Sequence, residues 1–322
     1  MTDAFESFLA NIREQLRINS ETEKPWHSFW YHRPTRDFPP RAIQQPDEWP
    51  GGERLSLACT QTALKPAEQK KLLARWCELL PTLKGIRFLW LQSRCPQELF
   101  EAACSVEGLE GLYVKWGPMT DLRPIAAAPR LKYLHIGSAP SLAPMEALAD
   151  LKQLEWLELA NIRALEDLAF LRSLTTLRGL GLAGDGNSIK YIYPASLEPL
   201  AALQALEWLS LTTLGVRDES LRPLARLPRL KHLMVANSFK FEEFAWLAGS
   251  RPDIECDGFT PVGEPVNWTL CKTCKGKTMV LLAGKGKPWS CQVCDAARIA
   301  KHEAAFRAVV HAARTESGKH QP

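Results

Sequence analysis

Apolar residues recur along this chain in a short motif, L-x-x-L-x-L, that returns about every 23 residues. Seven copies begin at intervals of 23, 22, 23, 23, 29 and 24 residues, at Ile86, Leu109, Leu131, Leu154, Leu177, Leu206 and Leu230. Alternation with a period of two predicts a β-strand with one buried face. Between the motifs, leucines recur every three or four residues, which predicts a helix or short 3₁₀ turns.

A single unit of this size cannot bury its own leucines, so the units must stack on one another around a shared core. Weaker copies at Leu55–Leu57 and Ile254–Cys256 mark the two ends of the array. A leucine-rich helical bundle is the alternative, but a bundle has no reason to keep the motif at a fixed period. The pattern therefore predicts an elongated α/β solenoid with one parallel sheet.

This arrangement resembles the leucine-rich repeat family, and its repeat length is closest to the short internalin-type units of bacterial proteins. The resemblance covers about residues 55–258 and implies a right-handed solenoid whose parallel sheet lines the concave side. The family usually places an asparagine at the ninth position of the repeat. Here the polar turn residue falls one position earlier, at Asn161 and Asn237, with substitutes at Ser93, Ser138 and Thr213.

The positions between the motif leucines are rich in aromatic residues. The third and fifth residues of each motif point away from the leucine core, to the concave face. Six of these fourteen positions are aromatic, although aromatic residues make up 9% of the chain. Tryptophan and tyrosine commonly anchor protein interfaces, so we predict a partner-binding surface formed by Phe88, Trp90, Tyr113, Trp116, Tyr133, His135, Trp156, Glu158, Trp208 and Met234. The alternative is that the rings only stack on one another along the sheet.

One motif carries only glycine at these two positions, Gly179 and Gly181. With strands about 4.8 Å apart, Trp156 and Trp208 on either side of it would lie roughly 10 Å apart. This spacing predicts a slot for one side chain of a partner. The same unit contains an insertion at residues 184–195, and the sequence leaves open whether this loop lines the slot or covers it.

The N-terminal segment, residues 1–54, differs from the repeats. Apolar residues at helical spacing predict an amphipathic helix over residues 4–17, followed by an arm rich in proline and tryptophan. A second helix is expected after Pro66, with one apolar face formed by Leu72, Leu73, Trp76 and Leu79. We expect this segment to cap the open end of the solenoid. Contact of the arm with a partner is the alternative.

Four of the nine cysteines form two C-x-x-C pairs near the end of the chain, at Cys271, Cys274, Cys291 and Cys294. Two such pairs bring four thiolates to one tetrahedral site of the kind that zinc prefers, and four protein sulfurs leave no open position for catalysis. A structural zinc ion is therefore predicted. A redox pair is the alternative, but neither C-x-x-C lies in a βαβ unit.

The chain around these cysteines is similar to a zinc ribbon over residues 268–295. Residues 278–283 predict a strand, and residues 284–287 a turn into a second strand near Trp289. Gly276 is expected to supply the backbone freedom that turns amide groups toward the thiolates. A helix is expected over Ala296–Ala313.

Positive charge is concentrated in this last part of the chain. The net charge is +4, and residues 267–322 contain ten Lys or Arg against three Asp or Glu. Nucleic acid binding through Lys275, Lys277, Lys285 and Lys287 is therefore a second functional hypothesis. The alternative is that these lysines offset the formal charge of −2 on a zinc ion held by four thiolates.

Nothing in the sequence forms a recognisable catalytic motif. The seven histidines are dispersed, there is no glycine-rich phosphate loop, and we expect His135 and Glu158 to form a hydrogen bond rather than acid–base chemistry. No signal peptide or membrane span is apparent, and the other five cysteines are scattered, which favours a cytoplasmic protein with reduced thiols.

The 322 residues thus divide into a cap (1–54), a solenoid (55–258) and a zinc module (259–322). We expect a non-enzymatic bacterial protein that binds a protein or peptide on its aromatic concave face. The sequence leaves open whether it is an adaptor, an immunity protein or an effector.

Overall fold

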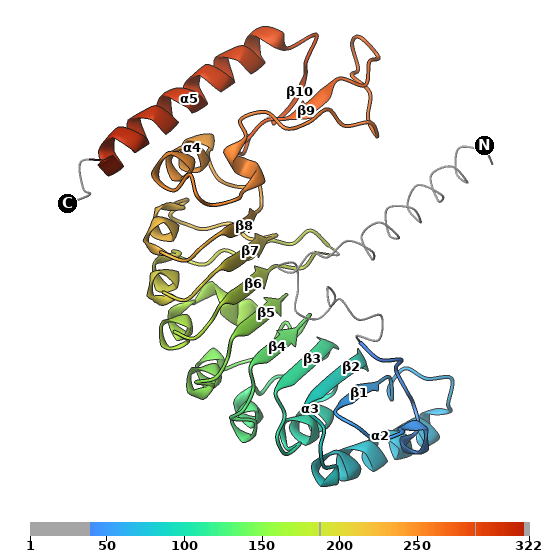
Figure 1. Cartoon of the computed structure of the whole chain (residues 1–322). Coiled ribbons are helices and arrows are strands. Elements are labelled where there is room, and N and C mark those ends of the chain that lie inside the picture. The colour runs from blue at the N-terminus through green and yellow to red at the C-terminus, as the bar shows by residue number, and fades with distance from the viewer. Residues whose placement is uncertain (1–38, 187, 287, 319–322) are drawn as a thin grey trace.

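The computed structural model describes residues 39–186, 188–286 and 288–318. In this part of the chain the repeats form a curved array, with one parallel sheet on the concave side and short helices on the other (Figure 1). The predicted helix over residues 4–17 and most of the proline-rich arm lie outside the described residues, as does Lys287.

The sheet has eight strands whose order in space is their order in the sequence, and every neighbouring pair is parallel. One strand falls on each predicted motif: β1 (Arg54–Leu57), β2 (Phe88–Arg94), β3 (Gly111–Trp116), β4 (Tyr133–Ile136), β5 (Trp156–Ala160), β6 (Gly179–Ala183), β7 (Trp208–Thr212) and β8 (His232–Val235). The truncated copy at Ile254 adds only one bridge, between Glu255 and His232. The predicted α/β solenoid with a parallel concave sheet is confirmed.

Each strand returns to the next through a helical segment on the convex side. The longer ones are α2 (Pro66–Leu79), α3 (Gln97–Cys104) and α4 (Phe241–Ser250). The central repeats use 3₁₀ turns: η3 (Arg123–Ala127), η4 (Met145–Asp150), η5 (Arg163–Glu166), η6 (Ala169–Ser173), η7 (Glu198–Ala202) and η8 (Arg222–Arg226). Three further 3₁₀ turns are η1 (Pro46–Glu48), η2 (Leu80–Thr82) and η9 (Asp257–Phe259). The expected helix after Pro66 is α2, which buries Leu72 and Trp76.

The leucines of all repeats form one continuous core between the sheet and the convex segments. Leu154, Leu157 and Leu159 of one motif are each at most 1% exposed, and the same cluster extends from Leu55 in β1 to Phe306 near the end of the chain. Because each leucine packs on its counterparts in the neighbouring repeats, stability comes from contacts between units rather than within them.

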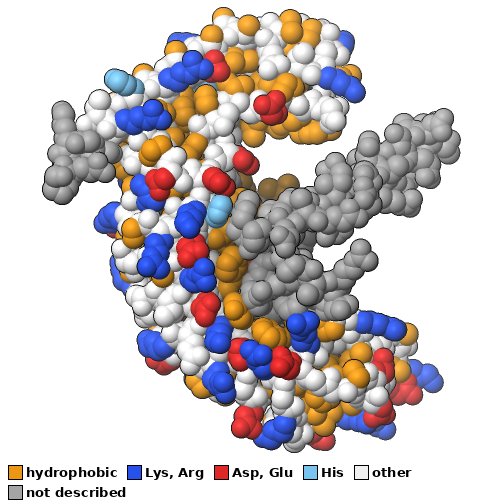
Figure 2. Space-filling view, in the orientation of Figure 1, with side chains coloured by type: hydrophobic (Ala, Val, Ile, Leu, Met, Phe, Trp, Pro, Cys, Tyr) orange, Lys and Arg blue, Asp and Glu red, His pale blue; other side chains and the backbone are white. Residues whose placement is uncertain are grey.

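A row of alternating charges runs along the edge of the sheet where the strands begin. The residue after the first apolar position of each motif is charged, and Glu53 holds the equivalent place in the weaker first copy. The sign changes at every step through Glu53, Arg87, Glu110, Lys132, Glu155, Arg178, Glu207, Lys231 and Glu255. Eight backbone hydrogen bonds of 2.7 to 2.9 Å connect these nine residues in order. Figure 2 shows the row of alternating blue and red side chains following the curve of the array. We call it the charge ladder.

Glu110 is the most deeply placed carboxylate of the ladder, at 7% exposed. It accepts hydrogen bonds from Arg87 Nε at 2.8 Å and Nη2 at 3.0 Å, and from Lys132 Nζ at 3.2 Å. The Arg87 guanidinium is the main reason that the pKa of Glu110 falls to about 2.

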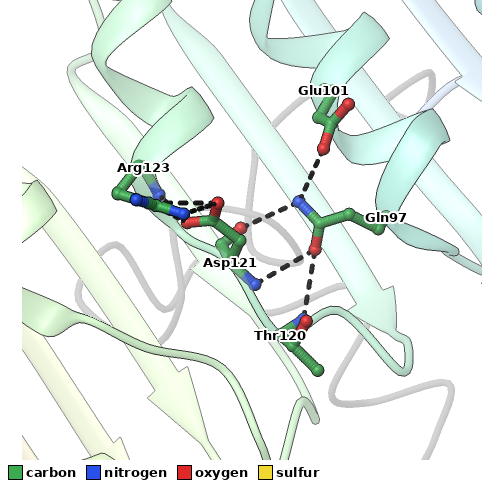
Figure 3. Close-up of polar contacts among 5 residues, drawn as sticks. All are labelled: Gln97, Glu101, Thr120, Asp121 and Arg123. Atoms are coloured by element: carbon green, nitrogen blue, oxygen red, sulfur yellow. Dashed lines mark hydrogen bonds and ion pairs between the residues drawn. The ribbon is translucent and has the colours of Figure 1, made fainter.

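Gln97, at the start of α3, connects its repeat to the next one (Figure 3). Its side-chain oxygen accepts from the backbone N–H groups of Thr120 and Asp121, both at 3.1 Å, and its amide nitrogen donates to Asp121 O at 3.0 Å. The carboxylate of Asp121 in turn pairs with Arg123 at 2.7 Å. One amide side chain thereby holds three backbone groups of the following loop.

The chain ends in a small module beyond β8. It contains an antiparallel hairpin, β9 (Met279–Leu281) with β10 (Trp289–Cys291), and the long helix α5 (Ala296–Gly318), which runs back across α4 (Figure 1). These are the strands and the helix expected from the sequence. Among the described helices, none has the length and apolar character needed to cross a membrane.

Replacing Glu110 tests the charge ladder. At pH 7, we expect Glu110→Gln to lower the free energy of unfolding by about 1–3 kcal/mol, because two cationic partners lose a charged acceptor. Since the folded-state pKa is depressed, this stabilisation is present above the usual carboxyl value of 4.5 and is lost as the pH falls toward about 2. The difference from wild type in urea denaturation should therefore shrink over that range. Glu107→Gln, at the exposed partner of Lys84, is the matched control and should have little effect.

Candidate functional site

The concave face has the composition that the motif predicts. One row of paired positions runs through Phe88, Gly111, Tyr133, Trp156, Gly179, Trp208 and His232, and the next runs through Trp90, Tyr113, His135, Glu158, Gly181, Ser210 and Met234. The structure thus brings nine of the ten candidate residues onto two adjacent rows. The tenth, Trp116, lies at the end of β3 and is 36% exposed.

Burial of these rings varies along the two rows. Trp90, Tyr113 and Trp208 are buried, whereas Phe88 and the other candidates on the two rows are half-buried. Trp90 and Tyr113 form an apolar cluster of their own, separate from the leucine core. The rings are therefore concave-face residues and do not belong to the leucine core.

The rings stack on one another along the sheet, as the alternative interpretation predicted. The rings of Tyr113 and His135 lie 4.5 Å apart with an angle of 20° between their planes, and those of Phe88 and Tyr133 lie 6.3 Å apart at 29°. Such cross-strand pairs contribute to sheet stability. Stacking also fixes the ring positions, which makes the surface rigid.

Glu158 is the polar centre of this face. Its Oε2 lies 2.7 Å from Nδ1 of His135, and its Oε1 accepts a hydrogen bond of 2.7 Å from Nε1 of Trp156. The side chains of His135 and Glu158 are only 14% and 12% exposed. The expected contact between these two residues is confirmed, and its geometry places a carboxylate in a fixed orientation beside an indole.

The predicted slot between Trp156 and Trp208 does not exist. Their ring centroids lie 5.2 Å apart with an angle of 21° between the planes, so the two indoles stack directly. Gly179 makes this possible, because a Cβ at that position would lie 2.2 Å from Cε3 of Trp156. Because the glycines of β6 have no side chains, the rings of Trp156 and Trp208 meet above β6, where the sequence predicts an open slot.

The inserted loop at residues 184–195 is anchored beside the segment that follows β7. Ile192 forms a parallel bridge with Leu214, and the ring of Tyr193 packs where a Cβ of Gly215 would lie, 2.6 Å from its Cε1 atom. Arg217 donates to Tyr193 O at 3.0 Å. With the slot closed, the question of whether this loop lines or covers it no longer arises.

The four clustered cysteines meet at one point. Their sulfur atoms all lie within 4.8 Å of one another, with Cys271 Sγ 3.8 Å from Cys294 Sγ and Cys274 Sγ 3.6 Å from Cys291 Sγ. Sulfurs at the corners of a tetrahedron with metal–sulfur bonds of about 2.3 Å would lie about 3.8 Å apart. None of the nine cysteines forms a disulfide. This arrangement can hold one metal ion with four thiolates.

Hydrogen bonds lower the pKa of two of the four thiols, Cys271 and Cys291, whereas burial and the neighbouring sulfurs raise the pKa of Cys294 to about 12. The backbone N–H of Cys294 at 3.4 Å and the hydroxyl of Thr278 at 3.0 Å lower the pKa of the Cys291 thiol to about 6. In contrast, burial in the solenoid raises the pKa of Cys59 to about 12. Directly after the first C-x-x-C, the residue with a left-handed backbone is Lys275, with φ +60°. The expectation that Gly276 supplies this backbone freedom was therefore wrong.

The module is joined to the last repeat by specific contacts. The side chain of Asn237 donates to Leu282 O at 3.0 Å and accepts from the Gly284 N–H at 2.5 Å. Gly284 has φ +102°, and a Cβ there would lie 2.6 Å from Phe241 N. Asn237, which was expected to be a turn residue of the repeat, therefore binds the β9–β10 hairpin instead. Ala283 enters the continuous core beside the solenoid leucines.

The lysines proposed to bind nucleic acid divide into two groups. Lys275 and Lys277 are exposed in the segment that follows the first C-x-x-C. The side chain of Lys285 forms an ion pair with Glu219, and the backbone N–H of Lys285 donates to Phe239 O at 2.7 Å. Lys285 therefore joins the module to the solenoid. Sequence reasoning missed Trp268, which is 70% exposed beside the metal site; its place just before Cys271 was the available signal.

No family model matches this chain, and no curated protein matches it. Among solved structures, it is similar to internalin C2 of Listeria monocytogenes, with 23% identity over 57% of this chain and 80% of that one, at a TM-score of 0.44. An internalin (inlF) of the same organism shares 19% identity over 55% and 62%, at 0.38. A leucine-rich repeat protein of Leptospira interrogans shares 16% over 56% of each chain, at 0.37. These are likenesses of fold alone.

Adding a methyl group under the stacked indoles tests the concave face. Gly179→Ala should lower the free energy of unfolding by about 1–3 kcal/mol, because its Cβ collides with the Trp156 ring. It should also weaken the near-ultraviolet circular dichroism of the indole pair. Gly181→Ala is the matched control, since its Cβ comes no closer than 3.3 Å to Cγ of Glu158 and 3.7 Å to Cζ3 of Trp208. Equal unfolding midpoints for the two variants in urea would contradict the stacked geometry.

Removing one sulfur tests the metal site. Cys291→Ser should lose the single equivalent of bound metal, measured by elemental analysis, and should speed amide hydrogen exchange in β9 and β10, because the small module cannot remain folded on its apolar core alone. Cys77→Ser changes a thiol of α2 far from the site and should keep the metal. Full metal content in Cys291→Ser would rule out the proposed ligand set.

Proposed function

We propose that this chain is a non-enzymatic recognition protein that binds a protein or peptide on the concave face of its repeats, while a zinc ion in the C-terminal module serves a structural role. The concave surface consists of Phe88, Trp90, Tyr113, Tyr133, His135, Trp156, Glu158, Trp208 and Met234, with Trp116 at its edge. A bacterial, cytoplasmic setting is part of this proposal.

The observation that carries the proposal is a fixed polar group set among stacked rings. Both oxygens of Glu158 are engaged, by His135 and by Trp156, and Trp156 itself stacks on Trp208. A carboxylate held beside indoles offers a partner an acceptor and an aromatic surface without the entropy cost of ordering them. Tryptophan and tyrosine residues in such surroundings are frequent energetic centres of interfaces.

Zinc is the metal that best suits the module. Four thiolates in a tetrahedral arrangement are typical of structural zinc sites, and four protein ligands leave no coordination position for a substrate. The backbone N–H groups of Thr273 and Cys294, each 3.4 Å from a sulfur, stabilise the negative charge of the thiolates. The ion would thereby hold the hairpin and α5 in place at the end of the solenoid.

Partner binding is testable with two concave substitutions. The partner is first captured on the immobilised full-length protein from a lysate of the source cells and then purified. Calorimetry with the purified partner should show that Trp156→Ala weakens binding by about 2 kcal/mol or more, and that Glu158→Gln weakens it less, because the amide retains one acceptor.

Trp268→Ala is the matched control for this experiment, because it removes an indole that is 70% exposed and belongs to the C-terminal module, not to the concave rows. Its affinity for the purified partner should equal that of the wild type. Urea unfolding of each variant separates loss of fold from loss of binding. If folded Trp156→Ala and Glu158→Gln both bind as well as the wild type, the concave face is not the recognition surface.

A further inference from the structure

The C-terminal module that contains the four cysteines carries an exposed aromatic patch. The proposed recognition on the concave face does not involve this patch. Trp268 is 70% exposed and Trp289 is 40% exposed, and their ring centroids lie 5.3 Å apart with an angle of 85° between the planes. Leu270 and Val293, close to them in the sequence, are 51% and 65% exposed. Half of the large exposed apolar side chains in the described part of the chain are these four. An apolar patch of this kind marks a contact surface.

The sulfur cluster holds this patch together. Trp268 precedes Cys271 by three residues, and Trp289 precedes Cys291 by two. Because the sulfurs of these two cysteines belong to one cluster within 4.8 Å, the two backbone segments that carry the rings are fixed relative to each other. Trp289 is also held by its pairing with Leu281 in the hairpin. The rings are therefore presented by a rigid support rather than by a free loop.

Cationic side chains lie close in the sequence to the same cysteines. Lys272 lies within the first C-x-x-C, and Lys275 and Lys277 follow directly after it. All three are exposed, and none forms an ion pair with a residue that the structure describes. The carboxylate of Asp295 accepts the Cys291 N–H at 2.8 Å and is thereby occupied. Four thiolates with a divalent ion would contribute a formal −2, which offsets only part of the excess of ten Lys or Arg over three Asp or Glu in residues 267–322.

We propose that this surface binds single-stranded nucleic acid, with unpaired bases stacking on Trp268 and Trp289 and phosphates contacting Lys272, Lys275 and Lys277. Base stacking on aromatic side chains beside a cationic groove is the usual chemistry of sequence-tolerant single-strand binding. Protein interfaces share the enrichment in tryptophan but are depleted in lysine, so the combination favours nucleic acid over a protein. The inference stands independently of the concave-face function.

The test uses the full-length, metal-loaded protein and a fluorescein-labelled oligothymidylate of about twelve nucleotides. Fluorescence anisotropy should show saturable binding at low salt. If three lysines contact three phosphates, the association constant should fall with salt on a double logarithmic plot with a slope of about −2. An oligomer of the same length that lacks its bases should bind more weakly, because it keeps the phosphates and loses the stacking.

Substitutions separate the two contributions. Trp268→Ala should weaken binding by about 5- to 150-fold, the range found for loss of one stacked base. The double variant Lys272→Glu with Lys277→Glu should weaken binding and flatten the salt dependence. Tyr193→Ala and Lys70→Glu remove an exposed aromatic ring and an exposed lysine of the solenoid and should leave the affinity unchanged. Metal content and melting temperature confirm that each variant is folded.

Three results would overturn the proposal. The first is absence of binding to the oligothymidylate at low salt, which would leave the patch as a surface for a protein partner. The second is equal affinity of the wild type and folded Trp268→Ala. The third is equal affinity for the ordinary oligomer and the one without bases, which would reduce the interaction to charge alone.

Discussion

Parallel pairing of identical leucine positions in successive strands is the constraint from which the rest of this structure follows. Each motif leucine packs on its counterpart in the next repeat, as the pairing of Leu134 with Leu157, and of Leu157 with Leu180, illustrates. Because side chains alternate in a strand, burying the leucines forces the residues between them onto the opposite face. The concave rows of aromatic and polar residues are therefore a direct result of the core.

The period of the leucines was sufficient to predict the strands, their order and the membership of both concave rows. It was not sufficient to predict how large side chains would pack beside glycine. An indole can lean across a neighbouring strand that has no side chain, so Gly179 brought Trp156 and Trp208 together instead of separating them. Strand spacing fixes where Cα atoms lie, whereas the positions of long side chains depend on the space that their neighbours leave.

The four-cysteine site was predictable because its spacing is specific, but its attachment to the solenoid was not. Asn237 was interpreted as a turn residue of the repeat, and the structure shows its side chain binding the hairpin of the module. Long-range contacts of this kind carry no local pattern in the sequence. The result is that a metal ion bound by the four sulfurs would stabilise the end of the repeat array as well as the module itself.

The alternation of charge in the ladder makes two repeats, rather than one, the smallest unit that this array can gain or lose without electrostatic cost. Removal of the repeat that carries Lys132 would place Glu110 beside Glu155. Two anions would then be neighbours at a place where Lys132 now separates them. Removal of two adjacent repeats would restore an anion next to a cation. Like charges directly opposite on paired strands are destabilising, so duplication or shortening of this solenoid should proceed in steps of about 46 residues, twice the length of its leucine period.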